Sequence, residues 1–256
     1  LSSAASDVYK RQVRCRPQGG FSSIAFAALD NIGANDPMGF GSRIACLTAP
    51  FICLDGVNEK GVSIAVLTLD SEPTRQKTEG RPTIATSLVI RLVLDRADST
   101  EAAVNLIRGY AMLASSGRDY HFFITDASGD SRVVEYDCDS PDRAMTVTRV
   151  EATTNFYAMH EDRVLPHQRN GRYGHGRERY DSVMDVIERT RGSATSEDAW
   201  EALRVSSQPP DPEDITSNTQ WSIVYSNTDL AAEASIRLHW EDRFGCDLRT
   251  GDVTKL

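Results

Sequence analysis

The side chains of this sequence best suited to covalent chemistry are its five cysteines, because a thiolate is both a strong nucleophile and a metal ligand. They are Cys15, Cys46, Cys53, Cys138 and Cys246, and no two form a Cys-x-x-Cys pair. Neither a zinc pattern nor a disulfide framework is indicated, so we expect reduced, mostly buried thiols and a reducing compartment. An internal Cys–His hydrolase stays open as a hypothesis, because the spacing does not say whether a histidine meets Cys46, Cys53 or Cys138.

Three histidines lie in one polar, glycine-containing segment, residues 158–176. A metal site there is conceivable, but the spacing of His160, His167 and His175 fits no common ligand pattern. We therefore expect no metal and no cofactor. We interpret these histidines as facing solvent or a substrate pocket.

The composition narrows the classes of partner. The 256 residues carry a formal net charge of −9, and the pI is about 5.1. An acidic balance disfavours nucleic acid and anionic membrane surfaces. No apolar run approaches the roughly 20 residues that span a bilayer. We expect a bacterial cytoplasmic protein that acts on a small molecule, with no nucleic-acid or membrane partner and with a homo-oligomer left open.

The first twelve residues, LSSAASDVYKRQ, differ in character from the rest. They lack the apolar central region of a signal peptide. They resemble translated adapter read-through of the kind found in metagenomic assemblies. We therefore expect residues 1–12 to be a non-native leader and residues 13–256 to form a single domain.

Hydrophobic periodicity divides the chain into strands and helices. Strands are expected at 21–28, 44–54 and 62–67, on both sides of a turn at 127–130, at 145–157, and in the segments TQWSIVYSN and ASIRLHW. Helices are expected at 82–96, about 99–110, 177–190 and about 197–205. This order is not the strict alternation of a parallel sheet. We predict an α+β fold of two mainly antiparallel sheets stacked face to face, with a helix pair on each outer face.

Several segments together resemble one family. LDGVNEKGVSIAVL, residues 54–67, is similar to a segment of the choloylglycine hydrolase superfamily, which includes bile-salt hydrolases and penicillin V acylases. Similar blocks follow in the family's order: RLVLDRADSTEAAVNLI, DYHFFITDASGDSRVVEY, TTNFY, GRERYDSV and TQWSIVYSNTDLAAEASIRLHW. The resemblance covers about residues 20–248. The linear-amide branch, related to acyl-CoA:6-aminopenicillanate acyltransferases, looks closer than the bile-salt branch.

The resemblance implies an N-terminal nucleophile hydrolase with a four-layer αββα fold. In that family autoproteolysis exposes an N-terminal cysteine. Its thiol attacks an amide carbonyl, and its α-amino group, with a pKa near ~8, is the base. Neither that cysteine, at the start of a first strand, nor the Arg-Asn-x-Asp segment that follows it in the family is found in this sequence. We therefore expect an N-terminal truncation and an inactive chain, with Cys15 disfavoured as the nucleophile because it lacks activating partners.

Three residues match family site positions. Asn155, in TTNF, matches the asparagine whose amide helps to form the oxyanion hole, where a neutral donor suits charge that develops in the transition state. Arg179 matches the arginine that holds the thiolate, and it is preferred over Arg177 because Tyr180 follows it. Thr68 stands where bile-salt hydrolases carry a second oxyanion asparagine, and its hydroxyl or backbone N–H is a possible donor. We expect all three to border one cavity.

The motif DGVNEKG itself is interpreted as scaffold. Gly56 and Gly61 give the backbone freedom where side chains would clash, while Asn58 and Glu59 satisfy loop amides. The predicted function is hydrolysis of linear amide C–N bonds in N-acyl compounds such as penicillin V, conjugated bile salts or N-acyl amino acids. The alternatives are a non-catalytic chain that binds acyl-amide ligands and an acyl-CoA-dependent N-acyltransferase.

Overall fold

The computed structural model describes residues 10–32, 34, 39–115, 117–210 and 218–256. Within them, seven strands form one antiparallel sheet in the order β1-β2-β3-β4-β7-β8-β9, and four strands form a second in the order β10-β11-β12-β13. Two short strands, β5 (Thr83–Ala85) and β6 (Ala111–Leu113), pair in parallel beside them. The strands of the large sheet are Lys10–Cys15, Ser23–Ala28, Cys53–Asn58, Ser63–Leu69, Asp119–Thr125, Ser131–Tyr136 and Met145–Arg149, and those of the smaller sheet are Trp221–Ser226, Ala231–Ile236, Arg243–Asp247 and Val253–Lys255.

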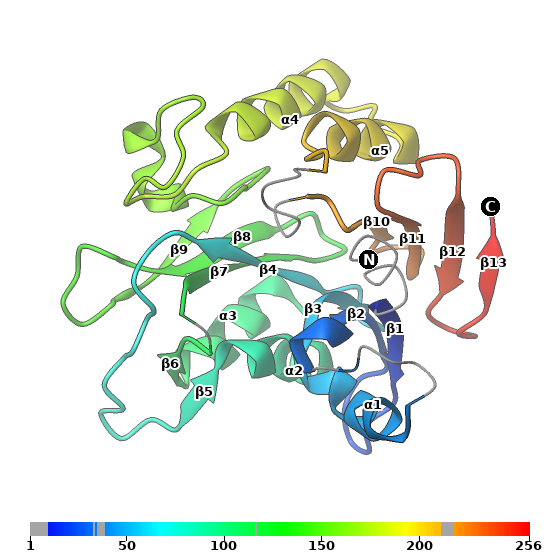
Figure 1. Cartoon of the computed structure of the whole chain (residues 1–256), viewed down its shortest axis with the longest axis horizontal. Coiled ribbons are helices and arrows are strands. Elements are labelled where there is room, and N and C mark those ends of the chain that lie inside the picture. The colour runs from blue at the N-terminus through cyan, green and yellow to red at the C-terminus, as the bar shows by residue number, and fades with distance from the viewer. Residues whose placement is uncertain (1–9, 33, 35–38, 116, 211–217) are drawn as a thin grey trace.

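Helices cover both outer faces of this pair of sheets (Figure 1). On one side α2 (Thr86–Arg96) and α3 (Thr100–Arg108) pack on β3, β4, β7 and β8. On the other side α4 (Arg177–Thr190) packs on α5 (Ser196–Val205), which contacts β10. The predicted αββα order of layers is therefore confirmed.

Two apolar clusters hold the layers together. The larger joins the inner faces of α2 and α3 to the large sheet, with fully buried Val89, Val93 and Phe122 among its members. The smaller lies between the two sheets and brings Ile24 and Val57 against Ala234. Burial of apolar side chains of this size stabilises a fold by about 1.5–3 kcal/mol each. The stacking of the two sheets therefore rests mainly on the smaller cluster.

Several predicted elements have different boundaries in the structure. The strand expected at 145–157 ends at Arg149, and the strand expected in ASIRLHW ends at Ile236. The expected strand at 44–54 is wrong, because α1 (Phe40–Ala45) and a 3₁₀ helix (Cys46–Phe51) precede β3. A short apolar run does not distinguish helix from strand, and Pro50 in this run lacks the N–H that a sheet ladder requires. The helix expected from residue 82 begins at Thr86, because residues 83–85 pair with β6 instead.

The DGVNEKG segment forms the end of β3 and the turn into β4. Asn58 is fully buried and makes four side-chain hydrogen bonds. Its amide donates to the Leu94 and Ala97 carbonyls, and its Oδ1 accepts from Lys60 N and Val62 N. A Cβ on Gly56 would lie 2.7 Å from the Leu94 side chain, so α2 packs directly on bare backbone. The scaffold interpretation therefore has a physical basis, since this turn fixes the C-terminal end of α2.

The residues expected to be a leader fall in two parts. Residues 1–9 lie outside the described residues. Lys10, Arg11 and Gln12 continue the ladder of Val13–Cys15, pairing with Ala28, Ala27 and Phe26 of β2. The expected boundary at residue 12 therefore does not coincide with an end of β1.

Candidate functional site

The structure brings Thr68, Asn155 and Arg179 into direct contact. Arg179 Nη2 donates to Asn155 Oδ1 at 2.9 Å. Asn155 Nδ2 donates to the Thr68 carbonyl oxygen at 2.9 Å and lies 3.4 Å from Thr68 Oγ1. These residues are 24 and 87 positions apart in sequence, yet a single chain of hydrogen bonds joins them. We call Thr68, Asn155 and Arg179 the amide triad.

Three different elements position the amide triad. Thr68 lies near the end of β4, Asn155 lies in the segment after β9, and Arg179 lies in the first turn of α4. All three side chains are half-buried. Because the guanidinium binds Oδ1, the Asn155 side chain can present only its NH₂ group to Thr68 and to any ligand. A cation on the amide oxygen also polarises the amide, which strengthens its N–H donors.

Burial shapes the electrostatics of the arginine. Desolvation lowers the pKa of Arg179 from its usual value, and the neighbouring Glu178 carboxylate partly opposes this effect. A guanidinium remains charged at neutral pH despite such a shift. The triad therefore contains a partly desolvated cation, whose interaction with a nearby anion is stronger than in water.

Hydrogen bonds lock the segment of Asn155 against the segment that leads into α4. His175 N donates to the Asn155 carbonyl at 2.8 Å, and Thr154 Oγ1 donates to the Gly176 carbonyl at 2.8 Å. Phe156 and Gly174 form a β-bridge between the same two segments. The geometry of Asn155 and Arg179 is therefore set by one paired unit, residues 153–157 and 173–179.

An aspartate–histidine pair adjoins the triad. His175 Nδ1 lies 2.6 Å from Asp70 Oδ2, and Asp70 follows the last residue of β4. Both side chains are partly exposed. Sequence reasoning placed His175 at solvent or a substrate pocket and missed Asp70. Only the fold brings these two residues together, since 105 positions separate them.

Buried acids of the large sheet hold the segment that follows Asn155. Glu135 is fully buried and accepts from Ala158 N at 3.0 Å and Met159 N at 2.7 Å. Its carboxylate also lies 3.5 Å from the ring of buried His121. Asp119 accepts from the Tyr157 hydroxyl at 2.7 Å. Sequence reasoning missed these anchors, although Glu and His at alternate positions of apolar strands are a signal of buried polar contacts.

A cavity of about 630 Å³ lies between the two sheets and the α4–α5 layer. Its wall is largely apolar and includes Leu67, Phe123, Val183, Ile187, Leu203 and Ile223. None of the triad residues lines this cavity, although Leu67 and Thr153 lie one and two positions from Thr68 and Asn155. The expectation that the three residues border one cavity is therefore not met by this space, although their mutual contact is observed.

One carboxyl group lies in the cavity wall. Asp55 accepts from Trp221 Nε1 at 2.9 Å and from the Tyr225 hydroxyl at 2.5 Å, so it joins β3 of the large sheet to β10 of the smaller one. Burial raises the pKa of Asp55 to about 6, against the opposing effect of the two donors. Desolvation therefore outweighs hydrogen bonding at this position.

None of the five cysteines contacts the amide triad through a described hydrogen bond. Buried Cys53 donates to the Ala49 carbonyl at 3.3 Å, and Cys246 donates to Gln12 Oε1 at 3.2 Å. Burial raises the pKa of Cys53 to about 12 and also raises the pKa of Cys15, Cys138 and Cys246. Burial therefore favours the protonated thiol at these four cysteines.

The layers and the strand order define an α+β protein with the fold of the N-terminal nucleophile hydrolases. A model of the linear amide C–N hydrolases of the choloylglycine hydrolase family matches residues 26–152, which confirms the resemblance seen in the sequence. None of the curated proteins compared with the chain matches it in sequence. Among the described residues, no helix is long and apolar enough to cross a bilayer.

Solved structures share the fold over nearly the whole chain. A penicillin V acylase from Agrobacterium tumefaciens superposes with a TM-score of 0.64 at 19% identity, covering 96% of this chain and 80% of that one. Two variants of the conjugated bile acid hydrolase from Clostridium perfringens give the same TM-score at 12% identity. They cover 96% and 97% of this chain and 86% and 89% of their own. At these identities the similarity establishes the fold alone.

Proposed function

We propose that the chain forms the body of an acylase that hydrolyses linear amide C–N bonds in N-acyl compounds. The observation that carries this proposal is the amide triad, in which Arg179 fixes the amide of Asn155 against Thr68. The match of residues 26–152 to the linear amide hydrolase model supports the same reaction class. Penicillin V, conjugated bile salts and N-acyl amino acids are the substrate types to test first.

Asn155 is the oxyanion donor in this proposal. Its oxygen is bound by Arg179, and its NH₂ group has one hydrogen directed at the Thr68 carbonyl. Nδ2 lies at a long 3.4 Å from Thr68 Oγ1, so its second hydrogen is available to a stronger acceptor while the planar amide stays in place. An alkoxide that forms on the attacked carbonyl is such an acceptor. Donors fixed before the reaction stabilise that charge without reorganisation.

The nucleophile in this proposal is the thiol of an N-terminal cysteine that is not among these 256 residues. Four of the five cysteines present have raised pKa values, and none has a described hydrogen bond to the triad. The α-amino group of the N-terminal cysteine takes the thiol proton, and sulfur bonds to the amide carbon. The C–N bond then breaks, and the amine leaves with that proton. Water hydrolyses the thioester to release the acid.

The cavity between the sheets and the α4–α5 layer suits an apolar acyl group. Its volume is about 630 Å³ and its wall is mainly apolar, and the wall includes Leu67 and Thr153, which lie one and two positions from Thr68 and Asn155 along the chain. Ligand sites commonly combine such a surface with a few fixed polar groups. Val183 and Ile187 of α4 lie on the wall, and the same helix carries Arg179. The helix would thereby couple acyl binding to the position of the guanidinium.

The test compares two proteins: the chain as it stands, and the chain joined behind a segment that carries the N-terminal cysteine. Amine release from penicillin V, a conjugated bile salt and an N-acyl amino acid is measured for each. We expect release only from the second protein, with an acyl-enzyme adduct on its N-terminal residue by mass spectrometry. Replacing that cysteine by alanine abolishes both signals.

Three outcomes would decide against the proposal. Equal hydrolysis by the chain as it stands would place the nucleophile among its own residues. Binding without turnover in the cysteine-bearing protein would favour an acyl-amide binding protein. Transfer of an acyl group from acyl-CoA to an added amine, without release of free acid, would favour an acyltransferase.

A further inference from the structure

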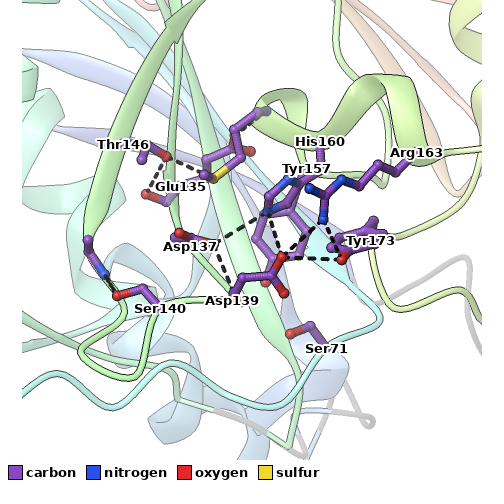
Figure 2. A network of polar contacts seen from close by, with 12 residues as sticks. Ser71, Glu135, Asp137, Asp139, Ser140, Thr146, Tyr157, His160, Arg163 and Tyr173 are labelled. Atoms are coloured by element: carbon purple, nitrogen blue, oxygen red, sulfur yellow. Dashed lines mark hydrogen bonds and ion pairs between the residues drawn. The ribbon is translucent and has the colours of Figure 1, made fainter.

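A second cluster of reactive side chains lies where the turn after β8 meets the 3₁₀ helix Ala158–Arg163 (η4). Asp137, Cys138 and His160 each offer one ligand atom, and these three atoms all lie within 4.8 Å of one another. His160 Nε2 is 3.4 Å from Asp137 Oδ1 and 3.8 Å from Asp139 Oδ2 (Figure 2). The cluster shares no residue with the amide triad.

The imidazole of this cluster is held in place before any ligand binds. His160 is only 8% exposed. Its ring packs 4.7 Å from the Tyr173 ring and 6.0 Å from the Tyr157 ring, measured between centroids. The backbone N–H of His160 donates to the Tyr157 carbonyl at 3.0 Å. A buried ring between two aromatic neighbours has little freedom to turn, so Nε2 stays directed at the acids, as a preorganised ligand must be.

The two aspartates beside the ring differ in their counterions. Asp139 pairs with Arg163 at 3.2 Å and also with Arg172. Asp137 forms no ion pair with any lysine or arginine among the described residues, and its Oδ1 accepts only the Asp139 N–H and faces His160. The charge of Asp137 is therefore left for a cation, while Asp139 is already neutralised by two arginines.

We propose that Asp137, Cys138 and His160 bind one zinc ion. One oxygen, one sulfur and one nitrogen donor form a set that suits zinc, which prefers four ligands and accepts all three types. Magnesium and calcium are disfavoured because they require several oxygen ligands. On binding, the Cys138 thiol loses its proton to solvent and coordinates as the thiolate. A water molecule or an Asp139 oxygen completes the coordination.

The zinc ion would connect two segments that matter to the fold of the site. Asp137 and Cys138 follow β8, whose Glu135 holds the backbone of residues 158 and 159. His160 lies five positions after Asn155 in the same held segment. Sequence reasoning sought metal ligands by spacing, among the cysteines and among the histidines of residues 158–176, and expected none. In the structure, His160 meets two ligands from the turn after β8, Asp137 and Cys138. Spacing within one segment therefore could not predict the site.

The test uses the full chain after chelator treatment, with Co²⁺ as a spectroscopic probe and Zn²⁺ as its competitor. We expect one Co²⁺ per chain, with a thiolate-to-cobalt charge-transfer band that disappears when Zn²⁺ is added. Cys138→Ser should remove the band and weaken Zn²⁺ binding at least tenfold, because a ligand is lost. The matched control, Cys46→Ser, alters a cysteine outside the cluster and should leave both signals unchanged.

A histidine pair gives an independent comparison. His160→Gln should weaken Zn²⁺ binding at least tenfold, whereas His167→Gln should leave it unchanged. If His160→Gln does not fold, as judged by circular dichroism, the nearly isosteric Cys138→Ser decides alone. Absence of stoichiometric binding to the folded chain would overturn the proposal. So would a charge-transfer band that persists in Cys138→Ser or one that is lost in Cys46→Ser.

Discussion

Two asparagines in the structure show how the same side chain serves different purposes. Asn58, in the β3–β4 turn, is fully buried, and four hydrogen bonds engage both ends of its amide. Asn155, after β9, is half-buried, and its Nδ2 makes one short contact, to the Thr68 carbonyl, and one long contact, to Thr68 Oγ1. A fully satisfied amide stabilises the fold, whereas a fixed and incompletely satisfied donor can serve a reacting group. The number of satisfied hydrogen bonds therefore distinguishes the scaffold asparagine from the site asparagine.

The largest effect is expected at the scaffold asparagine. Asn58→Ala leaves the buried Val62 N–H, the part-buried Lys60 N–H and two buried carbonyls at the end of α2 without this partner. We expect the free energy of unfolding to fall by about 3 kcal/mol or more, since each unsatisfied buried group costs about 1–3 kcal/mol. Urea denaturation followed by circular dichroism measures the change. A loss below about 1 kcal/mol would mean that water replaces the lost amide and that the scaffold interpretation overstates its role.

The site asparagine should show the opposite profile. In the cysteine-bearing protein, Asn155→Ala should lower kcat about a hundredfold or more, as loss of an oxyanion donor does. Its unfolding free energy should change by less than about 1 kcal/mol, because the side chain is half-buried. Steady-state kinetics and urea denaturation on the same preparation measure both. An unchanged kcat would reduce Asn155 to a structural residue and remove the contrast with Asn58.

The contact between Asp55 and β10 also belongs to the scaffold, and its contribution to stability depends on pH. Because burial raises the pKa of Asp55 from 3.8 to about 6, the folded state favours the protonated acid. This contribution to stability is present at low pH and is lost as the pH rises through about 6. Asp55→Asn keeps an acceptor for Trp221 and Tyr225 without the charge. We expect this variant to lose less stability than the wild type between pH 4 and 7 in thermal unfolding experiments.

The control for this experiment is an exposed acid. Glu101 lies on the surface, and hydrogen bonding to Arg132 lowers its pKa. Its contribution therefore has the opposite sign, being present above its unfolded pKa and lost as the pH falls. Glu101→Gln should lose as much stability between pH 5 and 7 as the wild type does. Identical pH profiles for Asp55→Asn and the wild type would show that the buried carboxyl is ionised across this range.

The smallest effects are expected at the helix caps, one in each outer layer. Ser99 accepts from Ala102 N at the start of α3, and Thr195 accepts from Asp198 N at the start of α5 in a capping box. Ser99→Ala and Thr195→Ala should each lower the unfolding free energy by about 1 kcal/mol. Thermal unfolding measures both. A loss confined to Ser99→Ala would indicate that the α4–α5 layer unfolds independently of the layer that contains α2 and α3.

How well the sequence predicts a feature of this protein depends on how far apart in the sequence the interacting residues lie. The hairpin around residues 127–130 and the helix at 177–190 are confirmed, because each is specified by its own turn residues and periodicity. The cap at Ser99 is likewise local, because its side chain accepts from a backbone N–H only three residues away. The strand expected at 44–54 failed because an apolar run without clear periodicity fits a helix equally well.

The sequence by itself therefore determined the order of layers and the identity of the hairpin scaffold, together with the resemblance that singled out Thr68, Asn155 and Arg179. Tertiary structure alone decided that Arg179 binds the oxygen of Asn155, that Asp70 meets His175, and that Asp137 and Cys138 face His160. Periodicity reports which face of an element is buried, and it carries no information on which distant polar group will lie opposite. Burial of apolar side chains stacks the layers, and this stacking decides which distant polar groups meet. A polar group that becomes buried then needs a hydrogen-bond partner among the groups within reach.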